Sequence, residues 1–168
     1  MVHQVEDRQV SCLVATISDT RTTEDDKSGL LIQSLLQEQG HHVVNHVIVP
    51  DDKTQIETIL ETAVEDDRIE AILLTGGTGI SKRDITIEAV EPKLVKEIPG
   101  FGELFRMLSY TEDIGSAALM SRALAGILEE DKAVFLMPGS SGAVKLAMNK
   151  LILPELSHVR EELTKHSS

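Results

Sequence analysis

Two glycine-rich segments of the sequence have the composition of phosphate-binding turns. They are Thr75-Gly76-Gly77-Thr78-Gly79 and Pro138-Gly139-Ser140-Ser141-Gly142. Glycine lets backbone N–H groups converge on an anion, and the N-terminus of a following helix adds partial positive charge. Glycine also occurs in tight turns for conformational reasons alone, so either segment by itself leaves both interpretations open. Two such segments in one chain favour a phosphate site.

Three familiar glycine motifs do not fit these segments. The dinucleotide motif G-x-G-x-x-G fails because Lys82 stands where a third glycine must follow Gly77 and Gly79. The P-loop is absent, since that lysine is preceded by serine and followed by arginine. Gly139 and Gly142 are too close together to frame the serine of a G-x-S-x-G elbow. A Rossmann dehydrogenase and a serine hydrolase are therefore disfavoured.

Two carboxylates beside the first segment could hold Mg²⁺. Asp84 and Glu88 are one helical turn apart and would share a helix face. Magnesium takes one or two protein carboxylates and completes its coordination with water and substrate phosphates. The alternative is a solvated helix start, where the helix dipole favours acidic residues. The neighbouring glycine-rich segment favours the metal-binding interpretation of these two carboxylates.

Other acidic residues divide into one candidate and several with structural roles. Asp52, with Gln55 three residues later, fits a helix capping box, which leaves Asp51 available for chemistry. The acidic runs at residues 24–26 and 65–67 are expected to solvate helix ends.

Histidine and cysteine give no metal or nucleophile site. His42 and His46 share a strand face by parity, but no third ligand accompanies them, so we expect exposed strand histidines. Cys12 lies in an apolar run and is predicted to be a buried core thiol.

The elements that position these residues alternate between strand and helix. Continuous apolar runs predict strands at 10–17, 43–49, 69–75 and 133–137, and helical spacing predicts helices at 27–39, 56–64 and about 86–96. Gly40 is placed to end the first helix. This alternation predicts an α/β protein with a mostly parallel central sheet. Both glycine segments and Asp51 would then lie at the carboxyl edge, where ligands bind in such sheets.

The region from 98 to 130 has a less regular pattern. Leu104, Phe105 and Leu108 indicate a helix after a turn at 99–102, and the apolar stretch 117–128 exceeds what one small domain needs to bury. Farther along, residues 144, 147, 148 and 151 share one helical face, and Pro154 starts or kinks a last helix.

Composition limits the domain count and the partners. The 168 residues fit one domain of about the common size, spanning 1–168 with residues 1–9 frayed. A net charge of −12 and 2% aromatic residues argue against nucleic acid and anionic membranes as partners. No run approaches the ~20 apolar residues of a membrane span, so a cytoplasmic location is expected.

The sequence resembles the MoaB and Mog proteins of molybdenum cofactor biosynthesis, whose relatives include a domain of gephyrin. The similarity extends over nearly the whole chain and within the family is greatest to the MoaB branch, judged from residues 104–110. The segments that carry it are Ser18-Asp19-Thr20, Asp26-Lys27-Ser28-Gly29, residues 75–79 with Arg83-Asp84, Pro99-Gly100-Phe101-Gly102-Glu103, Ser121-Arg122 and Pro138-Gly139-Ser140.

The resemblance implies a three-layer α/β/α molybdopterin-binding fold and an adenylyltransferase reaction. In that reaction AMP passes from ATP, the co-substrate, to the terminal phosphate of molybdopterin with the help of Mg²⁺. It implies catalytic roles for Asp51 and Asp84 and metal binding by Asp84 and Glu88. The implied substrate-binding residues are Thr75, Gly76, Gly77, Thr78, Gly79, Ser121, Arg122, Pro138, Gly139 and Ser140.

The resemblance also implies a homo-oligomer, either a trimer or a hexamer, and other molybdenum cofactor enzymes as partners. The chain departs from the adenylyltransferases at Ile87, where they often have proline, and at Ser141, where they have the proline of Pro-Gly-x-Pro. Two alternatives therefore stand beside the enzyme. One is a molybdopterin-binding or scaffold protein without turnover, and the other is a structural oligomerisation module.

Overall fold

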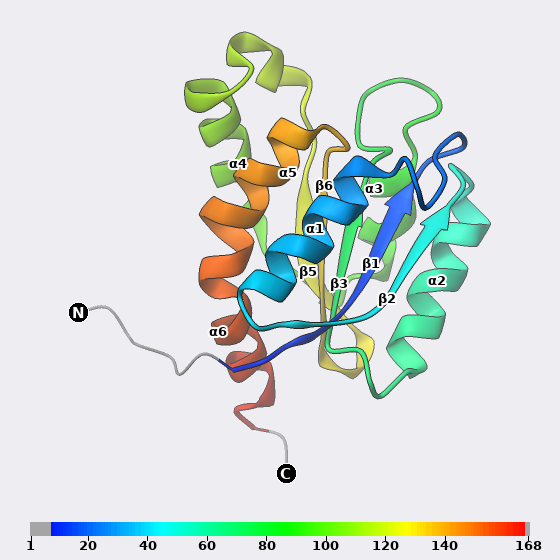
Figure 1. Ribbon diagram of the computed structural model, residues 1–168, viewed down its shortest axis with the longest axis vertical. Helices are drawn as coiled ribbons and strands as arrows, with labels where there is room; N and C mark the ends of the chain where they lie inside the picture. Colours follow the sequence, from blue (N-terminus) through cyan, green and yellow to red (C-terminus); the bar gives the residue numbers. More distant parts are fainter. Residues whose placement is uncertain (1–7, 167–168) are drawn as a thin grey trace.

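A six-stranded sheet runs through the centre of the computed structural model, which describes residues 8–166. The strands lie in the order β2-β1-β3-β6-β5-β4 (Figure 1). Their bounds are β1 (Ser11–Ile17), β2 (His42–Val49), β3 (Ala71–Thr75), β4 (Lys96–Glu97), β5 (Leu124–Leu128) and β6 (Lys132–Met137). The pairs β1–β2, β1–β3 and β3–β6 are parallel, whereas β5 is antiparallel to both β4 and β6. The expected mostly parallel sheet is confirmed.

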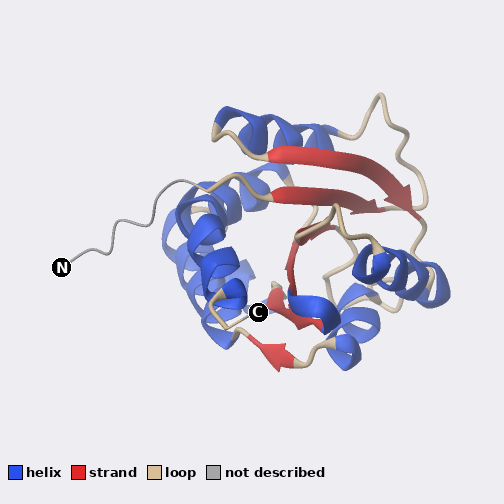
Figure 2. Cartoon of the chain, turned by 90° about the horizontal axis from the view of Figure 1, so that it is seen from below, coloured by secondary structure: helices blue, strands red, loops and turns tan. Residues whose placement is uncertain are grey.

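Helices pack on both faces of this sheet, which gives three layers (Figures 1 and 2). One face is covered by α1 (Lys27–Glu38), α4 (Pro99–Glu112), α5 (Ser141–Ala147) and α6 (Leu153–Thr164), the other by α2 (Lys53–Glu65) and α3 (Thr86–Val90). Successive strand residues alternate between the two cores, as strand pleating requires. In β1, Cys12 packs with the first set of helices and Leu13 with the second. Cys12 is buried in this core, as predicted, and burial, aided by the charge of Glu70, raises the pKa of its thiol to about 12.

The predicted helix ends are confirmed where capping chemistry is clear. Asp52 is the N-cap of α2, and its Oδ1 accepts from the backbone N–H groups of Thr54 (2.9 Å) and Gln55 (3.3 Å). Gly40 follows α1 with φ +82°, the left-handed conformation that favours glycine after a helix.

The predicted helix at 86–96 is too long. α3 stops at Val90, a single 3₁₀ turn (Glu91–Lys93) follows, and Lys96 belongs to strand β4. Pro92 explains the difference, because proline lacks the N–H that would continue the helical hydrogen bonds of α3.

Two boundaries after residue 98 also differ from the prediction. The expected turn at 99–102 is the first turn of α4, with Pro99 at a position where proline suits a helix start. The apolar stretch 117–128 contains the buried strand β5, which accounts for part of its length. Near the C-terminus, α5 runs through a π-helical segment (Met148–Ile152) into α6, and Pro154 lies in the first turn of α6 as expected.

The expectation that the two histidines share a strand face is wrong, and their expected exposure is confirmed for His42 but not for His46. Ser11 pairs with His42 and Val14 with His46, because Val44 is an extra residue where the register between β1 and β2 shifts. That bulge reverses the parity, so the two side chains lie on opposite faces of the sheet. His42 is exposed, but the side chain of His46 is only 10% exposed.

The expectation of a frayed N-terminus falls mostly outside the described residues. Arg8 and Gln9 are described and are held by hydrogen bonds: the Arg8 carbonyl accepts from Ser157 Oγ (2.6 Å), and Gln9 Nε2 donates to the Gly40 carbonyl (3.2 Å). No helix within residues 8–166 has the length and apolar character needed to cross a membrane.

Candidate functional site

The two glycine turns lie side by side at the carboxyl edge of the sheet. The first glycine turn (residues 75–79) ends β3 and the second (138–142) ends β6, and these strands are direct neighbours. Thr75 Oγ1 donates to the carbonyl of Pro138 (2.9 Å), and the Gly76 N–H donates to the carbonyl of Met137 (3.1 Å). The expectation that both turns lie at the carboxyl edge of the sheet is confirmed.

The conformation of the first turn requires glycine. Gly76 and Gly77 have φ values of +104° and +68°. A methyl group on Gly76 would collide with the Ile17 carbonyl, and one on Gly77 would collide with Thr86 Oγ1. Thr86 holds this conformation, because its Oγ1 donates to the Gly76 carbonyl (3.0 Å) and its N–H to the Gly77 carbonyl (3.1 Å).

Backbone donors of both turns are available to a ligand. Among residues 8–166, no acceptor takes the N–H groups of Gly77, Thr78 or Gly79 in the first turn, or those of Gly139 and Ser140 in the second. Free N–H groups at adjacent turns are the donors that an anion-binding site uses.

A cavity of about 350 Å³ opens where the turns meet. Its polar lining comes from residues 76–79 and 138–139 of the two turns, together with Asp84 and Ser121. Its apolar lining comes from Ile114, Ala117 and Met120, the last two in a 3₁₀ helix (Gly115–Met120) after α4. The cavity therefore offers polar backbone to one part of a ligand and an apolar wall to another.

Two acidic groups lie beside the first turn. Asp84 Oδ2 accepts from both the N–H (3.1 Å) and the Oγ (2.7 Å) of Ser81. A methyl group on Gly77 would lie 3.1 Å from Asp51 Oδ1, which puts this carboxylate next to the turn. Burial, and then the charge of Asp19, raise the pKa of Asp51, and the charge of Asp84 adds to this effect. The two predicted catalytic acids are thus close enough to interact electrostatically.

Glu88 and Arg122 form an ion pair behind the first turn. Arg122 Nη1 donates to Glu88 Oε2 (2.7 Å) and Nη2 to Oε1 (2.9 Å), and this hydrogen bonding lowers the pKa of Glu88. The same guanidinium donates to the carbonyls of Thr78 (2.9 Å) and Gly79 (2.7 Å). Both Glu88 oxygens are therefore engaged, and Arg122 braces the turn.

The sequence analysis missed the roles of two residues at the start of α1. Ser28 Oγ donates to the Gly139 carbonyl (2.6 Å), and Asp26, expected to be solvated in an acidic run, is only 1% exposed and is the N-cap of α1. The signal for the cap was present, because Asp26 directly precedes the predicted helix. Ser140 is itself the N-cap of α5, accepting from the Ala143 N–H (3.2 Å).

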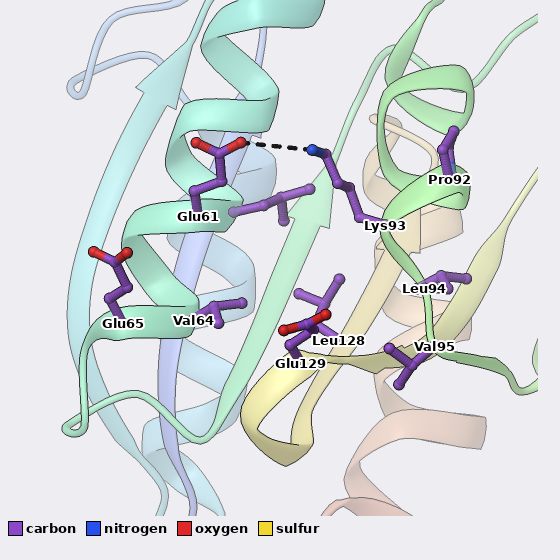
Figure 3. Close-up of a pocket in the computed structure, with 10 residues that line it drawn as sticks. Glu61, Val64, Glu65, Pro92, Lys93, Leu94, Val95, Leu128 and Glu129 are labelled. Carbon is purple, nitrogen blue, oxygen red and sulfur yellow. Dashed lines mark ion pairs between the residues drawn. The ribbon is translucent and has the colours of Figure 1, made fainter.

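Two larger cavities have different linings. One, of about 380 Å³, lies between α2 and the segment after α3, where Lys93 pairs with Glu61 (3.5 Å) and Glu65 and Glu129 add further carboxylates (Figure 3). The other, of about 610 Å³, lies at the amino edge of the sheet and is lined by acids and bases that include Glu70 and Arg160. Neither contains a glycine turn. Within residues 8–166 there is no group of three or more His, Cys, Asp or Glu side chains placed to hold a metal ion.

Known proteins have similar sequences and the same architecture. Residues 13–158 match the family described as "Probable molybdopterin binding domain". The chain is 60% identical over 156 residues to molybdenum cofactor biosynthesis protein B of Bacillus subtilis (strain 168). The matched residues cover 93% of this chain and 91% of that protein.

Solved structures agree with this match. A crystal structure of molybdenum cofactor biosynthesis protein B has a TM-score of 0.92 at 56% identity, over 95% of this chain and 99% of that one. The tungsten cofactor synthesizing protein MoaB of Pyrococcus furiosus has a TM-score of 0.83 at 38% identity, over 93% and 98% of the two chains. The chain therefore belongs to the MoaB and Mog family of molybdenum cofactor biosynthesis proteins.

Proposed function

We propose that this protein binds molybdopterin and transfers AMP from ATP to its terminal phosphate. The observation that carries the proposal is the cavity between the two glycine turns, with free backbone N–H groups on both turns and Asp84 in its wall. The apolar wall of Ile114, Ala117 and Met120 suits a flat heterocycle attached to those phosphates.

The reaction needs alignment and charge neutralisation more than a strong base. An oxygen of the pterin phosphate is already ionised near neutral pH and attacks the α-phosphorus of ATP. A new P–O bond forms, the bond to the β-phosphate oxygen breaks, and pyrophosphate leaves with the electron pair. Backbone N–H groups of the turns would hold the crowded phosphates in line for this displacement.

Asp84 and Asp51 are the residues that we propose to hold Mg²⁺. Asp84 uses only Oδ2 for Ser81, and Oδ1 accepts no hydrogen bond from residues 8–166. Two carboxylates are enough, because Mg²⁺ usually takes only one or two protein ligands and completes its coordination with water and substrate phosphates. When bound, the ion would neutralise phosphate charge. Glu88 would assist only if its ion pair with Arg122 opened.

The test is pyrophosphate release from ATP by the purified protein with Mg²⁺ and molybdopterin. Release that depends on molybdopterin supports the transferase. Binding of molybdopterin without release supports the second candidate, a binding or scaffold protein. The Glu88–Arg122 ion pair favours that candidate, because it withdraws one acid and one base from direct contact with substrate.

We also propose that the protein is a homo-oligomer, a trimer or a hexamer. Large apolar side chains of α4 and the following segment are exposed, including Met107 (63%), Tyr110 (61%) and Leu119 (92%). Several large exposed apolar side chains on neighbouring segments are typical of protein interfaces. Sedimentation at micromolar concentration tests it, and a stable monomer would refute it. Since ATP is the proposed co-substrate, the proposed location is the cytoplasm, where other molybdenum cofactor enzymes would be partners.

A further inference from the structure

A single buried carboxylate joins three elements of the fold. Asp26 Oδ1 accepts from the N–H of Gly29 in α1 (3.0 Å). Its Oδ2 accepts from Thr16 Oγ1 in β1 (2.6 Å) and contacts His46 Nε2 in β2 (2.7 Å). Asp26 is 1% exposed and Thr16 is 5% exposed, so hydrogen bonds here are shielded from water and the loss of one leaves a buried group unsatisfied.

Gly29 is required by this cluster. A methyl group on Gly29 would collide with Asp26 Oδ2 and would lie 2.5 Å from His46 Nε2 and 2.6 Å from Thr16 Oγ1. The glycine therefore leaves space in which the carboxylate, the imidazole and the hydroxyl meet against the start of α1.

The next contact leads from this cluster to the candidate site. Ser28, between Asp26 and Gly29 in the same turn of α1, is buried, and its Oγ donates to the Gly139 carbonyl (2.6 Å). A trans peptide is planar, and its C=O and N–H point in opposite directions. Holding the Gly139 carbonyl toward α1 therefore turns the Ser140 N–H away from α1, and no acceptor among the described residues takes it.

We infer that His46 and Asp26 are positioning residues for phosphate binding at the second glycine turn, an inference that rests on the proposed function. Neither residue touches the substrate. They fix the start of α1, and Ser28 transmits that position to the peptide between Gly139 and Ser140. His46 Nε2 supplies the hydrogen bond that holds Asp26 from β2.

The variants separate this hydrogen bond from simple packing. His46→Leu removes the donor, whereas His46→Gln keeps an N–H near the position of Nε2. His42→Leu, on the same strand but the opposite face, is the matched control. Ser28→Ala breaks the last link without altering the buried cluster, so it decides the matter if His46→Leu fails to fold.

Two measurements apply to each variant. Without ligand, amide hydrogen exchange at Ala143 and Val144 should accelerate in His46→Leu and Ser28→Ala, because both N–H groups bond to Ser140. The affinity for inorganic phosphate, measured by calorimetry, should fall by about 10- to 100-fold in the same variants. A shift of a binding group by less than about 1 Å is enough for a loss of this size. His46→Gln and His42→Leu should match the wild type in both.

The outcomes distinguish the inference from the proposed function. Folded His46→Leu and Ser28→Ala proteins with wild-type exchange and phosphate affinity would overturn the positioning role alone. Equal impairment of His46→Gln and His46→Leu would also overturn it, because the effect would then come from lost packing. A wild type that binds no phosphate and releases no pyrophosphate would overturn the proposed function, whatever the exchange data show.

Discussion

The two glycine turns use glycine for different physical reasons. In the first turn Gly76 and Gly77 have positive φ values, and side chains from elsewhere brace the loop through Thr86 and Arg122. Gly139 in the second turn has no positive φ, and a methyl group there would lie 3.4 Å from Gly76 Cα, an ordinary contact distance. The first turn thus depends on its own backbone conformation. The second depends on hydroxyl groups that hold its carbonyls.

The acidic groups divide in the same way. Asp84 and Asp51 lie beside the first turn, and Asp84 also lines the cavity. Beside the second turn, a methyl group on Gly142 would lie 3.0 Å from Asp113 Oδ2, but Asp113 is not among the residues that line the cavity. If the site transfers AMP, substitutions at the first turn should mainly lower turnover, and substitutions at the second should mainly weaken phosphate binding. The following substitutions test that division.

The largest effect is expected for Asp84→Asn. The amide oxygen can still accept from Ser81, so the turn and the stability of the protein should be kept while the charge is lost. Turnover should fall by about 10²- to 10³-fold, the usual cost of removing one electrostatic contact in a transition state. Pyrophosphate release and thermal melts measure the two quantities. A folded variant with normal turnover would contradict the catalytic role of Asp84 and would favour the alternative, a binding or scaffold protein.

Alanine at a glycine of each turn gives the next largest contrast. Gly77→Ala should lower the free energy of unfolding by about 1–3 kcal/mol, because the methyl group meets Thr86 Oγ1 in a backbone conformation unfavourable to alanine. Gly139→Ala should stay within about 0.5 kcal/mol of the wild type. Denaturant unfolding of both variants provides the comparison. Equal losses of unfolding free energy in the two variants would show that the second turn requires glycine as strictly as the first.

A smaller effect is expected when the brace of the first turn is removed. Arg122→Met loses the pair with Glu88 and the bonds to the carbonyls of Thr78, Gly79 and Asp84. We expect about 1 kcal/mol of destabilisation, since the side chain is one-third exposed (33%) and partly screened. Arg68→Met is the control, because the Arg68 side chain is exposed and solvent screens its pair with Asp66, so the free energy of unfolding should stay close to that of the wild type. Phosphate affinity should fall only in Arg122→Met. An unchanged affinity would mean that the turn keeps its shape without the guanidinium.

Much of this arrangement could be predicted from local sequence, and the rest depended on contacts between distant segments. The parallel strands are continuous apolar runs, and a parallel sheet necessarily brings the loops after β3 and β6 to one edge. The bulge at Val44, by contrast, reverses which face His46 occupies and depends on pairing with β1. Asp26 stands in an acidic run that looks like surface, and its burial follows from Thr16 and His46, which only the fold brings to it.

The smallest functional effect is expected at Asp52, which caps α2 much as Asp26 caps α1. Asp52 is exposed, and its carboxylate bonds only within its own helix start. Asp52→Ala should lower the free energy of unfolding by about 0.5–1 kcal/mol, the lower part of the range for a lost N-cap, because water can replace the side chain. Helix α2 packs on the face opposite α1, and the hydrogen bonds of its cap go to Thr54 and Gln55, not to either glycine turn. Phosphate affinity and pyrophosphate release should therefore equal those of the wild type once the protein is folded. A large loss of affinity in Asp52→Ala would show that any lost cap disturbs the site, and the selective connection from α1 to the second turn would no longer explain the data.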